Sequence, residues 1–147
     1  FAEQYAERLG TDGIYIATSE AFDDEMKQRI ELHRQRRAET TFQWLTREVP
    51  LELAEELEKI RVQSRSQKSK QRVILVDCLT LWLSNMIMPY EHLGEAEAAV
   101  YASLDRLIEV LGRMEQTVLF VTNACRNIRS AGWTVIWQVE RINALQA

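Results

Sequence analysis

Val73–Asp77 reads VILVD, four branched aliphatic residues closed by an aspartate. Two further runs have the same form, Ile14–Thr18 (IYIAT) and Val118–Thr122 (VLFVT), and each also ends on a polar residue. Nearly continuous apolar runs of this length are typical of strands in a parallel sheet that is covered on both faces. The segments between these runs have a helical period, and strand–helix alternation predicts right-handed βαβ crossovers. The sequence therefore predicts an α/β fold with a mostly parallel sheet flanked by helices.

Helical periodicity outlines the segments around the strands. The polar and basic stretch Ile60–Arg72 is expected to be a solvated connection, because it lacks the aromatic platforms of a nucleic-acid site. The tail Thr134–Ala147 fits either a helix or a last strand, and the pattern leaves both open. The expected helices are Phe1–Leu9, Glu20–Arg34, Leu51–Ile60 opened by Pro50, Leu79–Met88 and Glu95–Met114.

Composition restricts the class of protein. A chain of 147 residues, 46% of them apolar, is long enough for one domain with a continuous core, so residues 1–147 are expected to form a single domain. The net charge of -4 gives no general attraction to nucleic acid or to anionic membranes. No apolar run approaches the roughly 20 residues that span a bilayer. Cys78 and Cys125 do not suggest a disulfide framework, and free thiols fit a cytoplasmic location.

The carboxyl ends of the strands are the first candidate site, because ligands of open α/β sheets bind there. Asp77 stands where P-loop proteins hold a magnesium ion or its waters, although it could equally cap the helix that begins at Leu79. Thr18 and Ser19 precede a helix start, a position that suits phosphate binding. They are equally good helix caps, which is the more common role of such residues.

His33 is the second candidate. On a helix it falls within the arc of Phe22, Met26 and Ile30, which is the expected inward face. Arginines follow directly, and an imidazole beside guanidinium groups suits phosphate chemistry, since a neutral ring nitrogen can attack phosphorus while arginines neutralise the oxygens. The structural alternative is a half-buried histidine beside a solvated basic helix end, and the pattern alone favours that alternative.

Three ordered motifs resemble one known family. The segment IYIATSEAFDDEMKQRIELHRQRR (residues 14–37) is similar to the histidine-bearing segment of adenosylcobinamide kinase/guanylyltransferases. VDCLTLWLSNMI (residues 76–87) and LFVTN (residues 119–123) are similar to the second- and third-strand motifs of the same family. Together the motifs cover residues 14–123 in the family's order, and this match reverses the preference for a structural His33.

The resemblance implies a P-loop NTPase-like (RecA-like) fold and a bifunctional transferase. His33 matches the catalytic histidine that takes GMP from GTP as a phosphoramidate and passes it to adenosylcobinamide phosphate, giving adenosylcobinamide-GDP. The kinase step phosphorylates adenosylcobinamide with ATP or GTP, and Asp77 matches an acidic residue near the phosphates and a magnesium ion. Family members resemble homotrimers. The positions that match nucleotide contacts are Ala17, Thr18, Ser19, Arg34, Gln35, Arg36, Arg37, Glu48 and Asp77.

Two departures from the family pattern stand out. The family's Gly-rich phosphate loop is expected just before Phe1, so the chain is expected to lack it and, as written, to be a poor kinase. After Asn123 the sequence ACRNIRSAGWTVIWQ differs from the family's continuation, and some C-terminal residues are expected to be missing. Two alternative functions remain open: another P-loop-type small-molecule kinase in which His33 is structural, and a non-catalytic nucleotide-binding paralogue.

Overall fold

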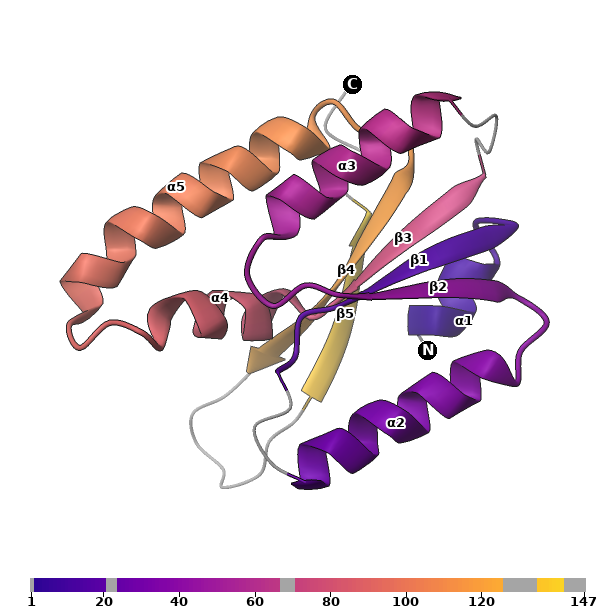
Figure 1. Ribbon diagram of the computed structural model, residues 1–147, viewed down its shortest axis with the longest axis horizontal. Helices are drawn as coiled ribbons and strands as arrows, with labels where there is room; N and C mark the ends of the chain where they lie inside the picture. Colours follow the sequence, from indigo (N-terminus) through magenta and orange to yellow (C-terminus); the bar gives the residue numbers. More distant parts are fainter. Residues whose placement is uncertain (1, 21–23, 67–70, 126–134, 142–147) are drawn as a thin grey trace.

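The computed structural model describes residues 2–20, 24–66, 71–125 and 135–141 (Figure 1). Five strands form one sheet in the order β2-β1-β3-β4-β5. Strands β1 (Asp12–Ala17), β2 (Gln43–Glu48), β3 (Arg72–Asp77) and β4 (Thr117–Cys125) are parallel, and β5 (Val135–Arg141) is antiparallel to β4. The expected mostly parallel sheet is therefore confirmed.

One strand, β2, was absent from the expectation, and a second, β5, lies in the tail where either a helix or a strand had been expected. β2 lies at an edge of the sheet, and its residues are half-buried or exposed, with Leu45 51% exposed. An edge strand with polar residues at Gln43, Thr46 and Arg47 lacks the continuous apolar run that marked β1, β3 and β4. β5 resolves the open question about the tail, since the chain forms a strand there.

The helices lie close to their expected places with shifted ends. α2 begins at Asp24 rather than Glu20 and extends to Ala38, and α3 begins at Leu53 and continues to Ser66, into the stretch expected to be a solvated connection. The charged end of α3 carries no continuous apolar face, which is why periodicity ended it early. The helices are α1 (Ala2–Glu7), α2 (Asp24–Ala38), α3 (Leu53–Ser66), α4 (Leu79–Ile87) and α5 (Leu93–Leu111).

Both faces of the sheet are covered. On one face α3, α4 and α5 pack against β1, β3 and β4 through a cluster that includes Ile74, Leu57 and Trp82. On the other face Ala6 of α1 packs against Tyr15 and Leu75, and α2 lies on this side as well (Figure 1). Central strands buried on both faces explain the unbroken apolar runs from which the fold was predicted.

α2 does not present His33 to the interior. His33 is exposed, and Leu32 is 48% exposed, whereas Arg37 near the end of the helix is buried. The prediction that His33 lies on an inward face is therefore wrong. The expected apolar arc relied partly on Phe22, which lies outside the described residues, and α2 buries an arginine near its C-terminal end instead.

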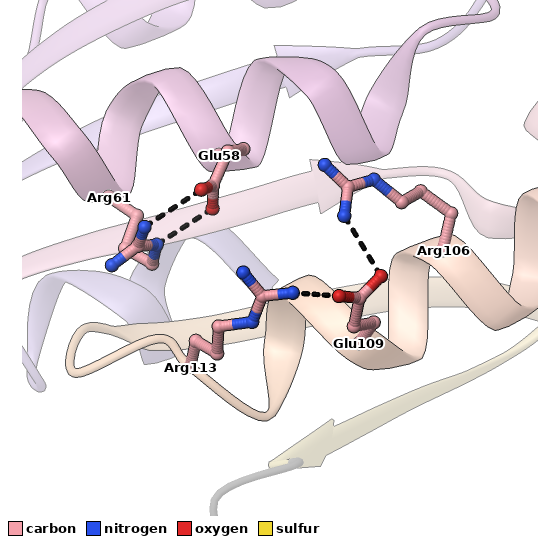
Figure 2. Close-up of polar contacts among 5 residues, drawn as sticks. All are labelled: Glu58, Arg61, Arg106, Glu109 and Arg113. Atoms are coloured by element: carbon pink, nitrogen blue, oxygen red, sulfur yellow. Dashed lines mark hydrogen bonds and ion pairs between the residues drawn. The ribbon is translucent and has the colours of Figure 1, made fainter.

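Charged side chains line the space between α3 and α5 (Figure 2). Arg61 donates two hydrogen bonds of 2.7 Å to Glu58 on α3, while Arg106 and Arg113 pair with Glu109. The hydrogen bonds from Arg61 are the main reason that the pKa of Glu58 is lowered, and the charges of Arg113 and Arg106 lower it further. Apolar packing near the sheet therefore joins the two helices, and further out each helix carries its own ion pairs, Arg61 with Glu58 on α3 and Arg106 and Arg113 with Glu109 at α5. No helix within the described residues is long and apolar enough to cross a membrane.

Candidate nucleotide site at the carboxyl edge

The ends of β1 and β3 meet at the carboxyl edge of the sheet. Ala17 lies opposite Asp77 in the parallel register, and Tyr15 lies two residues earlier on the same face. The long side chain of Tyr15 reaches diagonally across from β1 to β3, and its hydroxyl donates a hydrogen bond of 2.5 Å to Oδ2 of Asp77. Asp77 is half-buried, so its carboxylate is oriented by Tyr15 while remaining accessible from the edge.

Burial raises the pKa of the Tyr15 phenol far above its ordinary value of 10.0, and the neighbouring Asp77 charge and its hydrogen bond raise this pKa further. The phenol therefore keeps its proton and remains a hydrogen-bond donor to Asp77. The guanidinium of Arg37 lies 3.7 Å from the centroid of the Tyr15 ring, and its Nη1 donates to Glu3 at 3.1 Å. A partly buried chain of contacts thus runs from Glu3 of α1 through Arg37 of α2 and Tyr15 to Asp77.

Thr18 closes the gap between the two strand ends. Its hydroxyl donates to the carbonyl of Cys78 at 2.7 Å and accepts the Cys78 N–H at 2.8 Å, and its own N–H donates to the Asp77 carbonyl at 3.0 Å. Thr18 is fully buried. Because its hydroxyl is engaged on both sides, any side-chain contact to a nucleotide from this segment falls to Ser19, which is half-buried.

Asn85 ties the edge to α4. Its side-chain amide donates to the carbonyl of Thr18 at 2.7 Å and to that of Pro50 at 3.1 Å, and Asn85 is only 8% exposed. The Val49 N–H donates to the carbonyl of Ala17 at 2.8 Å, which extends the β1–β2 pairing past the strand ends. The segments that follow β1, β2 and β3 are therefore fixed relative to one another.

Asp77 does not cap the following helix. The N-cap of α4 is Cys78, whose sulfur accepts the Leu81 N–H at 3.4 Å. Burial raises the pKa of the Cys78 thiol, so the thiolate needed for nucleophilic chemistry is disfavoured. Of the two roles that the sequence left open for Asp77, capping is excluded, and the carboxylate stays available for a ligand.

Glu48 occupies a separate pocket beside this edge. The pocket, of about 300 Å³, follows the end of β2 and contains Glu48, Glu52 and Glu56 together with Lys59. An excess of carboxylates repels phosphate groups and favours hydrogen-bond donors. If Glu48 contacts a nucleotide, the contact therefore suits the nucleoside part rather than the phosphates.

His33 and its neighbours form an exposed surface on α2. His33, Arg34 and Arg36 are exposed, and so is Gln35, whose amide donates to Glu31 at 3.2 Å. Arg34 and the buried Arg37 also line a groove of about 490 Å³ that runs beside Phe42 and Trp44. Nε of Arg37 is buried and lacks a hydrogen-bond partner within the described residues.

The structure divides the residues singled out from the sequence into three groups. Ala17, Thr18 and Asp77 come together at the carboxyl edge, and Arg37 reaches Asp77 through Tyr15. The exposed face of α2 carries His33, and Glu48 lies in its own pocket. Tyr15, Asn85 and Glu3 were missed by sequence reasoning. Tyr15 could have been identified from the sequence, because it places a hydroxyl group within an otherwise apolar strand.

Asp77 is the residue that suits a magnesium ion. Among the described residues no group of three or more metal-binding side chains converges. Magnesium in nucleotide sites, however, is commonly held by one or two carboxylates, waters and the substrate phosphates. Tyr15 engages Oδ2 of Asp77, and Asp77 is half-buried at the end of β3, so this carboxylate fits an ion that arrives with a nucleotide.

Comparison with known proteins points in one direction. Residues 1–140 match the family described as cobinamide kinase / cobinamide phosphate guanyltransferase. The chain is similar to the bifunctional adenosylcobalamin biosynthesis protein CobP of Pseudomonas aeruginosa, with 40% identity over 83% of this chain and 62% of that protein. It is also similar to the bifunctional adenosylcobalamin biosynthesis protein CobU of Escherichia coli, with 32% identity over 82% of this chain and 67% of that protein. The chain thus spans about three fifths to two thirds of the length of these relatives.

Proposed function

The chain belongs to the cobinamide kinase / cobinamide phosphate guanyltransferase family, and from that premise we propose that it acts as a transferase in cobalamin biosynthesis. In the guanylyltransferase step, GMP passes from GTP to adenosylcobinamide phosphate. In the kinase step, the terminal hydroxyl of adenosylcobinamide receives a phosphoryl group from ATP or GTP. The observation that carries the proposal is the exposed imidazole of His33, which is followed on α2 by the exposed guanidinium groups of Arg34 and Arg36.

The proposed transfer proceeds through His33. A neutral ring nitrogen attacks the α-phosphorus of GTP, a P–N bond forms, and the bond to the leaving pyrophosphate breaks. A phosphate oxygen of adenosylcobinamide phosphate then attacks the same phosphorus, the P–N bond breaks, and the imidazole is regenerated. Arg34 and Arg36 neutralise the phosphate oxygens during both displacements. Exposure of His33 favours this role, because the ring must meet two successive substrates.

The carboxyl edge is proposed to serve the phosphates. Asp77, held by Tyr15, would hold a magnesium ion that neutralises phosphate charge when a nucleotide is bound. Ser19 offers a hydroxyl beside the same edge, and Glu48 would contact the nucleoside from its acidic pocket. Arg37 acts through Tyr15 and is a positioning residue for Asp77.

Mass spectrometry after incubation with GTP tests the proposal. We expect an acid-labile guanylyl adduct on the protein with its original sequence and none on His33→Asn. His92→Asn is the matched control, because His92 is the other histidine of the chain, is exposed and makes no side-chain hydrogen bond at the start of α5. The role of His33 would be refuted by an adduct that persists in His33→Asn. It would also be refuted if the protein with its original sequence consumed GTP without forming an adduct.

The family resemblance further supports a homotrimer. Sedimentation equilibrium of the purified protein at several concentrations tests this assignment, and a mass other than three chains contradicts it.

A further inference from the structure

An apolar groove lies between α4 and α5. Its volume of about 470 Å³ falls within the range of roughly 300–1,000 Å³ that is usual for small-molecule sites. Figure 1 shows α4 leaving the carboxyl ends of the strands and α5 running beside it. The apolar side chains that line the groove come from both helices: Leu83, Ile87, Ala96, Val100, Tyr101 and Leu104.

The groove presents an aromatic face to solvent. Tyr101 is 59% exposed, while Val100 and Leu104 are half-buried beneath the surface. Exposing a large aromatic ring beside an apolar floor costs hydration free energy, which a ligand with a broad apolar face recovers when it binds.

The charge of the groove selects against nucleotides. Glu97 is the charged residue of the lining, and it is exposed. A carboxylate without a neighbouring cation in the lining repels a triphosphate. It favours instead a ligand that is cationic and carries N–H donors.

The groove has a fixed position relative to Asp77. α4 begins two residues after Asp77, and with a rise of about 1.5 Å per residue Leu83 and Ile87 lie about 6–12 Å along the helix. Two buried side chains lock α4 to the edge: Asn85 donates to the Thr18 carbonyl, and Trp82 donates to the Leu51 carbonyl at 2.7 Å. The groove therefore has a fixed position on α4, the helix that leaves the edge at which Asp77 lies.

We propose that the α4–α5 groove seats the corrin ring of the corrinoid substrate, an inference that rests on the proposed function and extends it. A corrinoid offers a wide ring with apolar faces, a rim of amide groups and a positively charged cobalt centre. The ring packs on Tyr101 and Val100, and Glu97 accepts hydrogen bonds from the rim amides and complements the cobalt charge. The amide-linked arm that bears the reacting hydroxyl then extends along α4 towards Asp77.

Retention of aquacyanocobinamide in equilibrium dialysis, read by its visible absorption, tests this placement. We expect Tyr101→Ala and Glu97→Lys each to weaken retention at least tenfold. The matched controls on α5 are Ile108→Ala, which removes an apolar side chain that is 66% exposed, and Glu95→Lys, which reverses an exposed charge. Neither residue lines the groove, so both controls should retain the corrinoid as the unmodified protein does.

Guanylylation of His33 by GTP is measured on the same variants, so the two proposals fail separately. Normal guanylylation with impaired retention supports the groove. Normal guanylylation with unchanged retention in the Tyr101→Ala/Glu97→Lys double variant overturns it, and so does an unmodified protein that retains no corrinoid. If Tyr101→Ala instead changes the sedimentation mass and leaves retention intact, the groove is an interface with a second copy and the proposal is wrong. Loss of guanylylation in the unmodified protein refutes the proposed function itself.

Discussion

The hydroxyl of Tyr15 donates a hydrogen bond of 2.5 Å to Oδ2 of Asp77, and this contact joins β1 to β3 at the edge where the candidate phosphate site lies. Asp77 faces two demands, since it must be accessible to a ligand and yet keep one orientation. Tyr15 meets the second demand from inside the sheet, because burial keeps its phenol protonated. This one pair of residues therefore contributes both to the stability of the fold and to the geometry of the site.

Tyr15→Phe should lower the free energy of unfolding by about 1–3 kcal/mol, because a hydrogen bond to a charged group is lost. Urea unfolding monitored by circular dichroism measures the change. Tyr101→Phe removes the hydroxyl of an exposed tyrosine and should stay within about 0.5 kcal/mol of the unmodified protein. Equal losses in the two variants would show that the Asp77 contact contributes nothing specific.

The same variant has a predicted pH signature. The pKa of Tyr15 is raised in the folded protein, so its contribution to stability is complete below the unfolded-state pKa of about 10 and is lost as the pH rises above that value. Unfolding free energies measured from pH 8 upward should therefore fall less steeply for Tyr15→Phe than for the unmodified protein. Parallel curves would contradict the burial of the phenol.

Arg34 and Arg37 should behave in opposite ways although they lie in one basic segment. Arg37→Ala removes the contact with the Tyr15 ring and the ion pair with Glu3, and should destabilise the fold by about 1–3 kcal/mol. Arg34→Ala removes an exposed side chain, so stability should change by less than about 0.5 kcal/mol while the KM for GTP rises. Thermal unfolding of both variants measures their stability, and guanylylation kinetics measure their KM for GTP. An Arg34→Ala variant that unfolds more easily than Arg37→Ala would reverse these assignments.

Asn85→Ala should lower the free energy of unfolding by about 2–4 kcal/mol, because the carbonyls of Thr18 and Pro50 both lose a buried partner. Unfolding in guanidinium chloride measures this change in the free energy of unfolding. Ser84→Ala, on the adjacent exposed position of α4, is the control and should remain within about 0.5 kcal/mol. A small effect of Asn85→Ala would mean that water replaces the amide, and that α4 is not fixed to the edge in the way inferred above.

The sheet was predictable from sequence where burial is two-sided. β1, β3 and β4 are covered on both faces, and their apolar runs follow directly from that burial. β2 was not predictable by the same rule, because Leu45 is 51% exposed on this edge strand and the polar residues Thr46, Arg47 and Glu48 follow it directly. The ends of α2 and α3 were misplaced because charged residues continue each helix beyond its apolar positions.

The candidate site was predictable only in part. A polar residue at the end of a buried strand located Asp77, since strand ends meet at one edge whatever the details of packing. Its partner Tyr15 depends on the β1–β3 register, which no single strand encodes. The contrast between the buried Arg37 and the exposed His33 depends on how α2 lies against the sheet. Because α2 lacks a clear apolar face, its helical period placed His33 on the inward side, which is wrong.

The ion pair between Glu58 and Arg61 on α3 predicts a loss of stability in acid (Figure 2). The hydrogen bonds from Arg61 lower the pKa of Glu58 to about 2, with further lowering by the charges of Arg61, Arg113 and Arg106. A carboxylate whose folded-state pKa is depressed stabilises the fold above its unfolded-state value of 4.5, and this contribution disappears as the pH falls from there towards 2. Unfolding free energies measured between pH 6 and pH 2 should therefore fall less for Glu58→Gln than for the unmodified protein. Glu55→Gln, an exposed position on the same helix, should reproduce the unmodified curve, and a Glu58→Gln curve with the same slope as that control would show that the Arg61 pair does not link the fold to pH.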